Sequence, residues 1–183
     1  MNYNFTTYWF CRSEIRRHLK KMIDVKQELH FLEIGSYEGR SSCYFLDTFM
    51  EHEKSTLTCV DPFDSSDTTT HVTNEIESRF LSNINVSKNG KKCILHKLYS
   101  DDFFKINTNT YDVIYIDGSH IPENVIKDMT NSLKILKNNG IMWMDDYKSS
   151  ALLIKTMDDF VNEHKTEVDV ILKGYQLALR KIK

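Results

Sequence analysis

The sequence predicts a doubly wound α/β fold, with a mostly parallel seven-stranded sheet that ends in an antiparallel hairpin. Short apolar runs rich in Ile and Val alternate with longer segments of helical period along most of the chain. The stretches between successive runs are long enough for crossover helices, which place parallel strands in one sheet with helices on both faces. The last two runs instead meet at a tight turn that contains glycine, as in a hairpin.

The individual elements follow from these patterns. Apolar residues recur at helical spacing over Ser13–Glu28, opposite a basic face, and predict a leading amphipathic helix. This helix would belong to an extension of residues 1–28, ahead of a single domain of residues 29–183. The expected strands are Leu29–Ile34, Thr56–Val60, Lys92–Leu98, Val113–Ile116 and Ile141–Met144, with a hairpin within Val168–Lys183 that turns at Lys173 and Gly174. The expected helices are Ser41–Met50, Asn74–Ile84, Pro122–Lys137 and Ala151–Glu163, and Asp64–His71 is expected to be a loop near the site.

Composition excludes several classes of protein. The 183 residues are 40% hydrophobic and 27% charged, which is typical of a globular domain rather than a disordered or fibrous chain. A net charge of −2 gives no overall attraction to nucleic acid or to an anionic membrane. No apolar stretch is long enough to span a bilayer, and the first residues do not resemble a signal peptide. Four cysteines without a CxxC pair favour a reduced compartment, so we expect a cytoplasmic protein.

Acidic residues stand in or directly after the last residues of four of the five predicted parallel strands. They are Glu33, Asp61, Asp117 and the pair Asp145 and Asp146. The carboxyl ends of parallel strands meet at one edge, where such folds bind their ligands. Clustered carboxylates repel one another unless a cation or hydrogen-bond donors offset their charge. Each acid taken alone is also consistent with a turn or a helix cap.

The turn after the first strand has glycines at Gly35 and Gly39, where the backbone must turn tightly and admit a ligand. It lacks the GxGxxG pattern of dinucleotide-binding folds, because Tyr37 stands at the second glycine position and Glu38 adds negative charge. Asp61 lies at the spacing at which such folds place an acid on a ribose diol. S-adenosylmethionine, which has no phosphates and carries a sulfonium and an ammonium group, suits an acid-lined pocket better than NAD.

Several segments resemble the motifs of a known family. FLEIGSYEGRSS, TCVDPF, KLYSDDFF, YDVIYIDGSH and NGIMWMDDY look like the successive motifs of class I S-adenosylmethionine-dependent methyltransferases. More narrowly, IDGSH and MDDY resemble the branch that contains the macrocin-type sugar and antibiotic O-methyltransferases and the cephalosporin-hydroxylase-like proteins. The resemblance covers about Leu29–Lys183. It implies a Rossmann-like fold and O-methylation of a small hydroxylated acceptor, such as a sugar.

The resemblance also implies roles for individual residues. Glu33, Gly35, Ser36 and Gly39 would shape the methionine end of the cofactor site, Asp61 would hold the ribose, and Ser100 with Asp101 would flank the adenine. Asp117, which would also contribute to the cofactor site, Asp145 and Asp146 would bind a divalent metal, for which their oxygen atoms favour Mg²⁺. His120 is the implied catalytic base. The chain departs from the branch at Ser119, at Ile121 or Pro122, and at Asn139, which leaves the acceptor open.

These residues fit the chemistry of O-methylation. A metal bound by three carboxylates would orient a diol and lower the pKa of its hydroxyl, and His120 would accept the proton. His120 is equally typical of a solvated loop. Three other functions stay open. An NAD-dependent oxidoreductase is disfavoured by the missing GxGxxG pattern. A nucleic-acid methyltransferase is suggested by the basic face of residues 12–21, although such a stripe is usually a solvated helix face and no NPPY-like motif is present. The third is a binding module without activity. The extension would cover the cofactor or form a homodimer contact.

Overall fold

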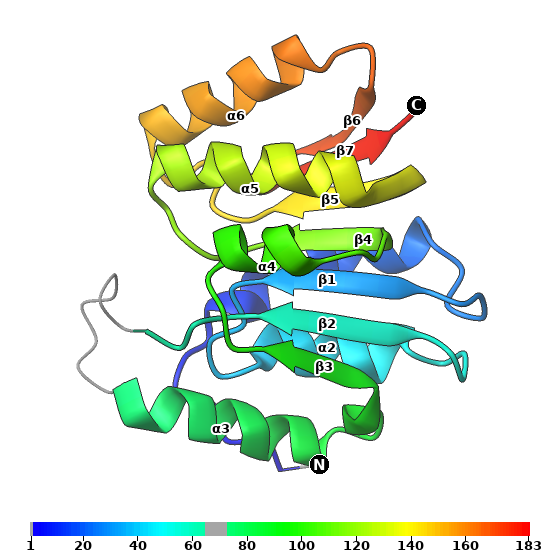
Figure 1. The fold of residues 1–183 in the computed structure, drawn as a ribbon, viewed down its shortest axis with the longest axis vertical. Coiled ribbons are helices and arrows are strands. Elements are labelled where there is room, and N and C mark those ends of the chain that lie inside the picture. Colours follow the sequence, from blue (N-terminus) through cyan, green and yellow to red (C-terminus); the bar gives the residue numbers. More distant parts are fainter. Residues whose placement is uncertain (1, 65–72) are drawn as a thin grey trace.

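The computed structural model describes residues 2–64 and 73–183. Within these ranges the chain forms one seven-stranded sheet between layers of helices (Figure 1). The strands are β1 (His30–Ile34), β2 (Thr56–Val60), β3 (Cys93–His96), β4 (Tyr111–Ile116), β5 (Leu136–Met144), β6 (Val168–Lys173) and β7 (Leu177–Lys181). The loop expected at 64–71 lies outside the described residues except for Asp64, so that expectation stays a prediction.

The strand order is β3-β2-β1-β4-β5-β7-β6, and β1 to β5 run parallel while β7 is antiparallel to β5 and β6. The predicted fold class, a doubly wound sheet with a final antiparallel hairpin, is confirmed. The chain winds outward in one direction from β1 through β2 to β3 and then returns to β4 on the other side of β1. The carboxyl ends of β1 and β4 therefore form the topological switch point, where open α/β sheets bind ligands.

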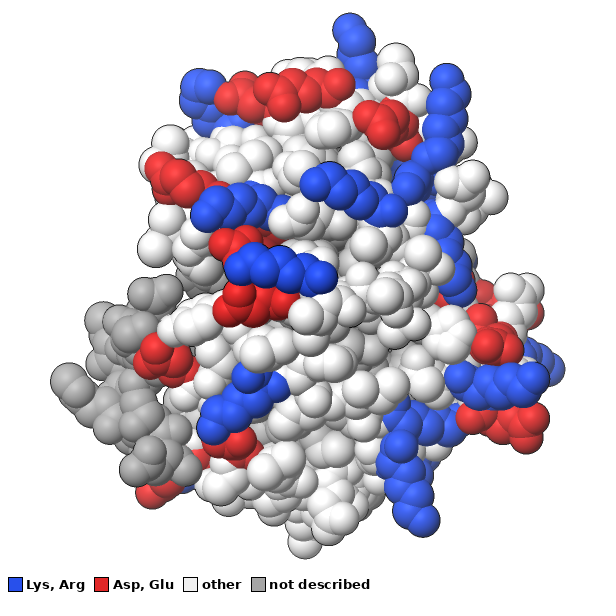
Figure 2. Space-filling view, viewed as in Figure 1, with Lys and Arg blue, Asp and Glu red and all other residues white. Residues whose placement is uncertain are grey.

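Helices cover both faces of the sheet. They are α2 (Arg40–Phe49), α3 (Thr73–Val86), α4 (Ser100–Ile106), α5 (Pro122–Ile135) and α6 (Ala151–Glu163). In Figure 1, α4, α5 and α6 lie in front of the sheet and α2 lies behind it. The seven-residue α4 is too short for a clear helical period and was not among the expected helices. Basic and acidic side chains are interspersed over the face that Figure 2 shows.

Alternating side chains of each strand point to opposite faces, which produces two hydrophobic clusters. Leu32 and Ile34 of β1 pack with α5 and α6 on one face. Phe31 packs with α2 and with Phe80 of α3 on the other face. Glu33 has the same parity as Phe31, so its side chain points beneath α2 rather than toward the open edge of the sheet.

The predicted leading helix over Ser13–Glu28 is wrong as a continuous element. The structure has a 3₁₀ turn η1 (Trp9–Arg12), a single helical turn α1 (Ile15–His18) and a second 3₁₀ turn η2 (Leu19–Lys21). Ile15 and Leu19 are buried against the sheet, so the apolar period is real. The backbone N–H of Ile15, the first residue of α1, has no partner within the helix and donates to the side chain of Gln176. The boundary at residue 28 stays a prediction.

Two further observations bear on the expected environment. All four cysteines lie in the described residues as free thiols. Over the described ranges, no helix combines the length and the apolar character that crossing a bilayer requires.

Candidate active site

A cleft of about 990 Å³ opens at the carboxyl edge of the sheet, at the switch point. This volume is within the range of small-molecule sites. Its walls come from the turn after β1, the ends of β2, β4 and β5, the start of α4, and residues 7–17 of the extension. Of the predicted residues, the cleft is lined by Gly35, Ser36, Asp61, Ser100, Asp101, Asp117, His120, Asp145 and Asp146. Glu33 and Gly39 do not line it.

The turn between β1 and α2 has a backbone that its sequence requires. Gly35 has φ +84°, and a Cβ atom there would lie 2.2 Å from the carbonyl oxygen of Asp117. Gly39 also has a left-handed φ, +80°, and begins α2. Any larger residue at position 35 would push apart the ends of β1 and β4. Glycine here is therefore what lets the two strand ends close around the site.

Asp61 fastens this turn to the end of β2. One carboxylate oxygen accepts the backbone N–H groups of Ser36 at 2.7 Å and Tyr37 at 2.9 Å. The other oxygen accepts the N–H of Phe63 at 2.7 Å. Burial raises the pKa of Asp61, and these three N–H groups oppose that effect. The carboxylate still lines the cleft, where a ribose hydroxyl could donate to it.

Glu33 supports the same turn from below. Its side chain is fully buried, and its Oε2 accepts hydrogen bonds from Ser42 and, at 3.0 Å, from Ser36. Its Oε1 has no hydrogen-bond partner among the residues that the structure describes, and burial raises the pKa of the carboxyl. Glu33 does not line the cleft itself but bonds to Ser36, which does. Its role at the methionine end stays a prediction.

At the other side of the turn, Ser100 and Asp101 begin α4 and face the cleft as predicted. They are accompanied by Asp128 of α5, a buried residue that also lines the cleft. Burial raises the pKa of Asp128 to about 6, and a hydrogen bond with Ser100 opposes the rise. Sequence reasoning missed Asp128, although an acid three residues after Val125, on the buried face of α5, is a signal that could have found it.

The carboxylates that follow β4 and β5 face one another. The hydroxyl of the buried Tyr115 lies 3.0 Å from Oδ2 of Asp117 and 2.8 Å from Oδ2 of Asp145. One hydroxyl proton cannot serve both carboxylates at once. Burial and the charges of Asp145 and Asp146 raise the pKa of Asp117 well above its usual range. Such an arrangement favours a proton or a cation between the acids.

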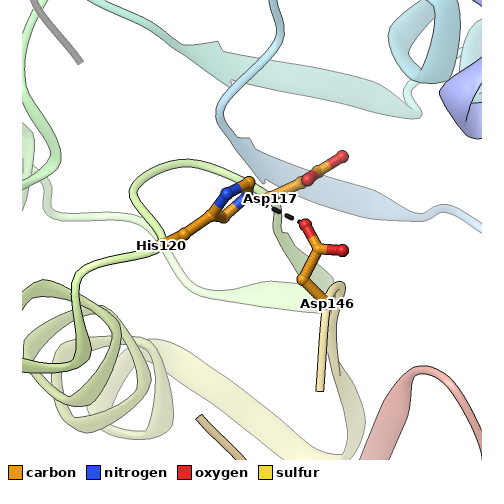
Figure 3. Close-up of side chains that lie close together, drawn as sticks. All are labelled: Asp117, His120 and Asp146. Atoms are coloured by element: carbon orange, nitrogen blue, oxygen red, sulfur yellow. Dashed lines mark ion pairs between the residues drawn. The ribbon is translucent and has the colours of Figure 1, made fainter. Parts of the chain in front are cut away.

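A group suited to a divalent cation lies beside this pair (Figure 3). Asp117, His120 and Asp146 each offer one ligand atom, and these atoms lie within 4.8 Å of one another. Nε2 of His120 is 2.9 Å from Oδ2 of Asp146, and this contact raises the pKa of His120. Asp146 has φ +52°, an uncommon backbone for a non-glycine residue and one often found at functional sites. Two carboxylates and one imidazole fit Mn²⁺ at least as well as Mg²⁺.

Asp145, the third predicted metal ligand, is outside this group. Its Oδ1 accepts the N–H of Asp146 at 2.9 Å and Nε2 of Gln176 at 2.7 Å. Its Oδ2 is the atom near Tyr115. Both oxygens of Asp145 thus have hydrogen-bond partners, as those of Asp146 also do, and a metal set of Asp117, Asp145 and Asp146 stays a prediction.

Gln176 and Tyr175, which sequence reasoning missed, complete the site from the hairpin. The amide of Gln176 is fully buried and bonds to Asp145, Ser13, the N–H of Ile15 and, at 2.9 Å, Nε1 of Trp143. The hydroxyl of Tyr175 donates to Oδ1 of Asp146 at 2.5 Å. Both residues follow the predicted turn at Gly174. That turn lies near the site because β7 pairs with β5, and the local sequence does not reveal this pairing.

Solved structures share this architecture. The O-methyltransferase TomG from Streptomyces achromogenes, in complex with SAM, is 14% identical, with a TM-score of 0.66 over 91% of this chain and 77% of that chain. An O-methyltransferase from Bacillus cereus, in complex with SAH, is 14% identical, with a TM-score of 0.65 over 92% and 80% of the two chains. A provisionally assigned rRNA methylase from Clostridium thermocellum is 13% identical, with a TM-score of 0.72 over 92% and 94%. These likenesses show that the chain has the fold of methyltransferases.

The sequence itself places the chain in a family. A family model described as a methyltransferase domain matches residues 32–147, more than half of the chain, and the chain belongs to this family. No curated protein sequence matches the chain significantly. The family favours a methyltransferase over the oxidoreductase that the sequence had left open, while the narrower macrocin-type branch stays a prediction.

Proposed function

We propose that the protein is an S-adenosylmethionine-dependent O-methyltransferase that uses a divalent metal and acts on a hydroxyl group of a small molecule, such as a sugar. The observation that carries the proposal is a single cleft with two halves. The turn at Gly35 and the carboxylate of Asp61 lie in one half, and the group of Asp117, His120 and Asp146 lies in the other. Cofactor and acceptor could therefore meet within one cavity.

The cofactor half suits S-adenosylmethionine by charge. Asp61, Asp101 and Asp128 line the cleft around the turn, and their acidic character complements the sulfonium and ammonium groups. Tyr37 fills the position where a pyrophosphate would need glycine. The SAM and SAH bound to TomG and to the Bacillus cereus enzyme add support from proteins of the same fold.

In the acceptor half, the residues would bind a hydroxyl and take its proton. When bound, S-adenosylmethionine supplies a transferable methyl group, and a divalent cation held by Asp117 and Asp146 supplies charge that favours an ionised hydroxyl. His120 is exposed enough to reach an acceptor. Asp146 would stabilise the imidazolium that forms when His120 takes the proton, as a carboxylate does beside other catalytic histidines.

His120 has two candidate roles that experiment separates. A purified, EDTA-treated full chain is titrated with Mn²⁺ and then assayed for methyl transfer to catechols and nucleotide sugars. If His120 is the base, His120→Ala lowers turnover by about 100-fold or more and leaves Mn²⁺ affinity within a factor of about three. If it is a ligand, Mn²⁺ affinity falls as well.

The matched control is His52→Ala, because His52 lies before β2 at the opposite edge of the sheet. That variant should keep wild-type turnover and Mn²⁺ affinity. Full turnover by His120→Ala, or Mn²⁺ binding that survives Asp146→Asn, would contradict the proposal.

An RNA acceptor is the second candidate. The exposed basic residues of the extension, Arg12, Arg16, Arg17, Lys20 and Lys21, lie on one short segment, and the Clostridium thermocellum protein shares the fold. RNA binding by such a surface should weaken steeply with salt. Methyl transfer to total RNA, measured alongside the small-molecule panel, distinguishes the two acceptors.

A further inference from the structure

Part of the extension lies along the acceptor half of the cleft. The backbone N–H of Gln176 donates to Glu14 at 2.8 Å, and Nε2 of Gln176 donates to Ser13 at 2.7 Å. Tyr175, the neighbour of Gln176, donates to Asp146. Ser13 and Glu14 are therefore fixed beside the group of Asp117, His120 and Asp146, and both line the cleft.

Two arginines flank this fixed point and line the same cleft. Arg12 and Arg17 are exposed, and the guanidinium group of neither makes a hydrogen bond or an ion pair with any residue that the structure describes. Arg16 stands between them and does not line the cleft. It donates to the carbonyl of Cys11 at 2.8 Å and lies over the rings of Phe10 and Tyr44. In this segment the arginines that face the cleft are the ones left without a partner.

An unpaired guanidinium in a ligand cleft is a recognition group for carboxylate or phosphate, which it can bind through two parallel hydrogen bonds. The positive charge does not match S-adenosylmethionine, whose sulfonium and ammonium groups outweigh its one carboxylate. Among the extension residues that line the cleft, Glu14 is one carboxylate against the two guanidinium groups of Arg12 and Arg17. The charge of these arginines therefore fits the acceptor.

We propose that the acceptor is an anionic small molecule, whose carboxylate or phosphate is bound by Arg12 and Arg17 while its hydroxyl faces Asp117, His120 and Asp146. This inference rests on the proposed methyltransferase function and specifies its substrate class. It also means that the extension contributes to substrate specificity and does not only cover the cleft.

Calorimetry on the full chain, saturated with SAH and Mn²⁺, tests the inference with matched probes. One arm compares 3,4-dihydroxybenzoate with neutral 3,4-dihydroxybenzyl alcohol, and the other compares glucose 6-phosphate with glucose. In at least one arm the anion should bind about 10-fold more tightly than its neutral counterpart. The arm that shows this preference identifies whether the acceptor carries a carboxylate or a phosphate. The double variant Arg12→Gln/Arg17→Gln should lose that preference.

The double variant Lys20→Gln/Lys21→Gln is the control, because it removes the same charge from exposed residues that do not line the cleft. It should keep the preference. No preference in either arm, or an equal preference in both double variants, would overturn the inference. So would a loss of SAM affinity in Arg12→Gln/Arg17→Gln, which would assign the arginines to the cofactor carboxylate.

Two outcomes separate this inference from the proposed function. Normal SAM binding without any anion preference refutes the anionic acceptor alone. Absence of SAM binding by the wild-type chain refutes the methyltransferase proposal and this inference with it. A transfer RNA that binds more tightly than every small anion, and that loses affinity in both double variants, would replace the small molecule with RNA.

Discussion

The two halves of the cleft hold their carboxylates in different ways. In the cofactor half, Asp61 is satisfied by three backbone N–H groups from its own loop and from the turn after β1. In the acceptor half, Asp117 and Asp145 share the hydroxyl of Tyr115, and side chains supply most of the remaining donors. The carboxylate of Asp61 is therefore hydrogen-bonded by the backbone, while the clustered carboxylates of the acceptor half still favour a positive charge between them.

This difference has a chemical consequence. Backbone donors are rigid and present in every state of the protein, so the cofactor half is organised before any ligand arrives. Burial and the charges of the neighbouring acids keep the pKa of Asp117 raised, and the repulsion among these acids favours the arrival of a cation. We expect the cofactor half to bind without metal and the acceptor half to depend on it.

The largest effect should come from one substitution in each half. Asp61→Asn replaces an acceptor of three N–H groups by an amide, and should weaken SAM binding about 100-fold while Mn²⁺ affinity is unchanged. Asp146→Asn removes one carboxylate of the metal group, and should abolish Mn²⁺ binding while SAM affinity stays within a factor of about three. Calorimetry on both variants measures the two affinities. Loss of both ligands in either variant would show that the halves are not independent.

The sequence predicted the first half of the cleft better than the second. Gly35 and Gly39 lie in the turn after β1, and Asp61 follows β2, the next strand along the chain. Their spacing in the sequence was therefore enough to place them. Tyr175 and Gln176 reach the site only because the hairpin pairs with β5, a contact that no local pattern encodes. The five parallel strands and the hairpin followed from apolar runs and turn residues.

The leading helix was expected from a correct apolar period, but α1 ends after one turn at His18 and a 3₁₀ turn follows. The sequence predicts Asp145 as a metal ligand because it belongs to an acidic pair, and that role stays a prediction. Its hydrogen bonds with Gln176 and Tyr115 could not be foreseen, because Gln176 and Tyr115 lie far from Asp145 in the sequence.

The next largest effect concerns the buried amide of Gln176, which links the extension to the acceptor half. Gln176→Leu keeps the size of the side chain and leaves the N–H groups of Trp143 and Ile15 without an acceptor. We expect a loss of about 2 kcal/mol in the free energy of unfolding. This loss corresponds to a melting temperature lower by roughly 4–8 °C.

Gln27→Leu is the matched control, because Gln27 is exposed, and it should change stability by less than about 0.5 kcal/mol. Chemical denaturation of both variants provides the measurement. Equal stabilities would mean that the extension is not held through Gln176.

The smallest effect is a pH dependence in the cofactor half. Burial raises the pKa of Asp128 to about 6, so the folded state holds this proton more tightly than the unfolded state. The stability contribution of Asp128 is therefore present below pH ~4 and is lost as pH rises through about 6. Asp128→Asn should match the wild type near pH 4 and exceed its stability by on the order of 1 kcal/mol at pH 8.

Thermal melts at several pH values measure this difference, with the exposed Asp102→Asn as control. A constant offset between Asp128→Asn and the wild type across this pH range would show that Asp128 titrates in the same way folded and unfolded.

The most direct test of the whole account is a calorimetric titration of the EDTA-treated full chain with S-adenosylmethionine, repeated with Mn²⁺. We predict that one equivalent binds under both conditions with similar affinity, because the cofactor half is organised by backbone donors. Absence of binding under both conditions, or binding that requires the metal, would contradict the division of the cleft and the cofactor assigned to it.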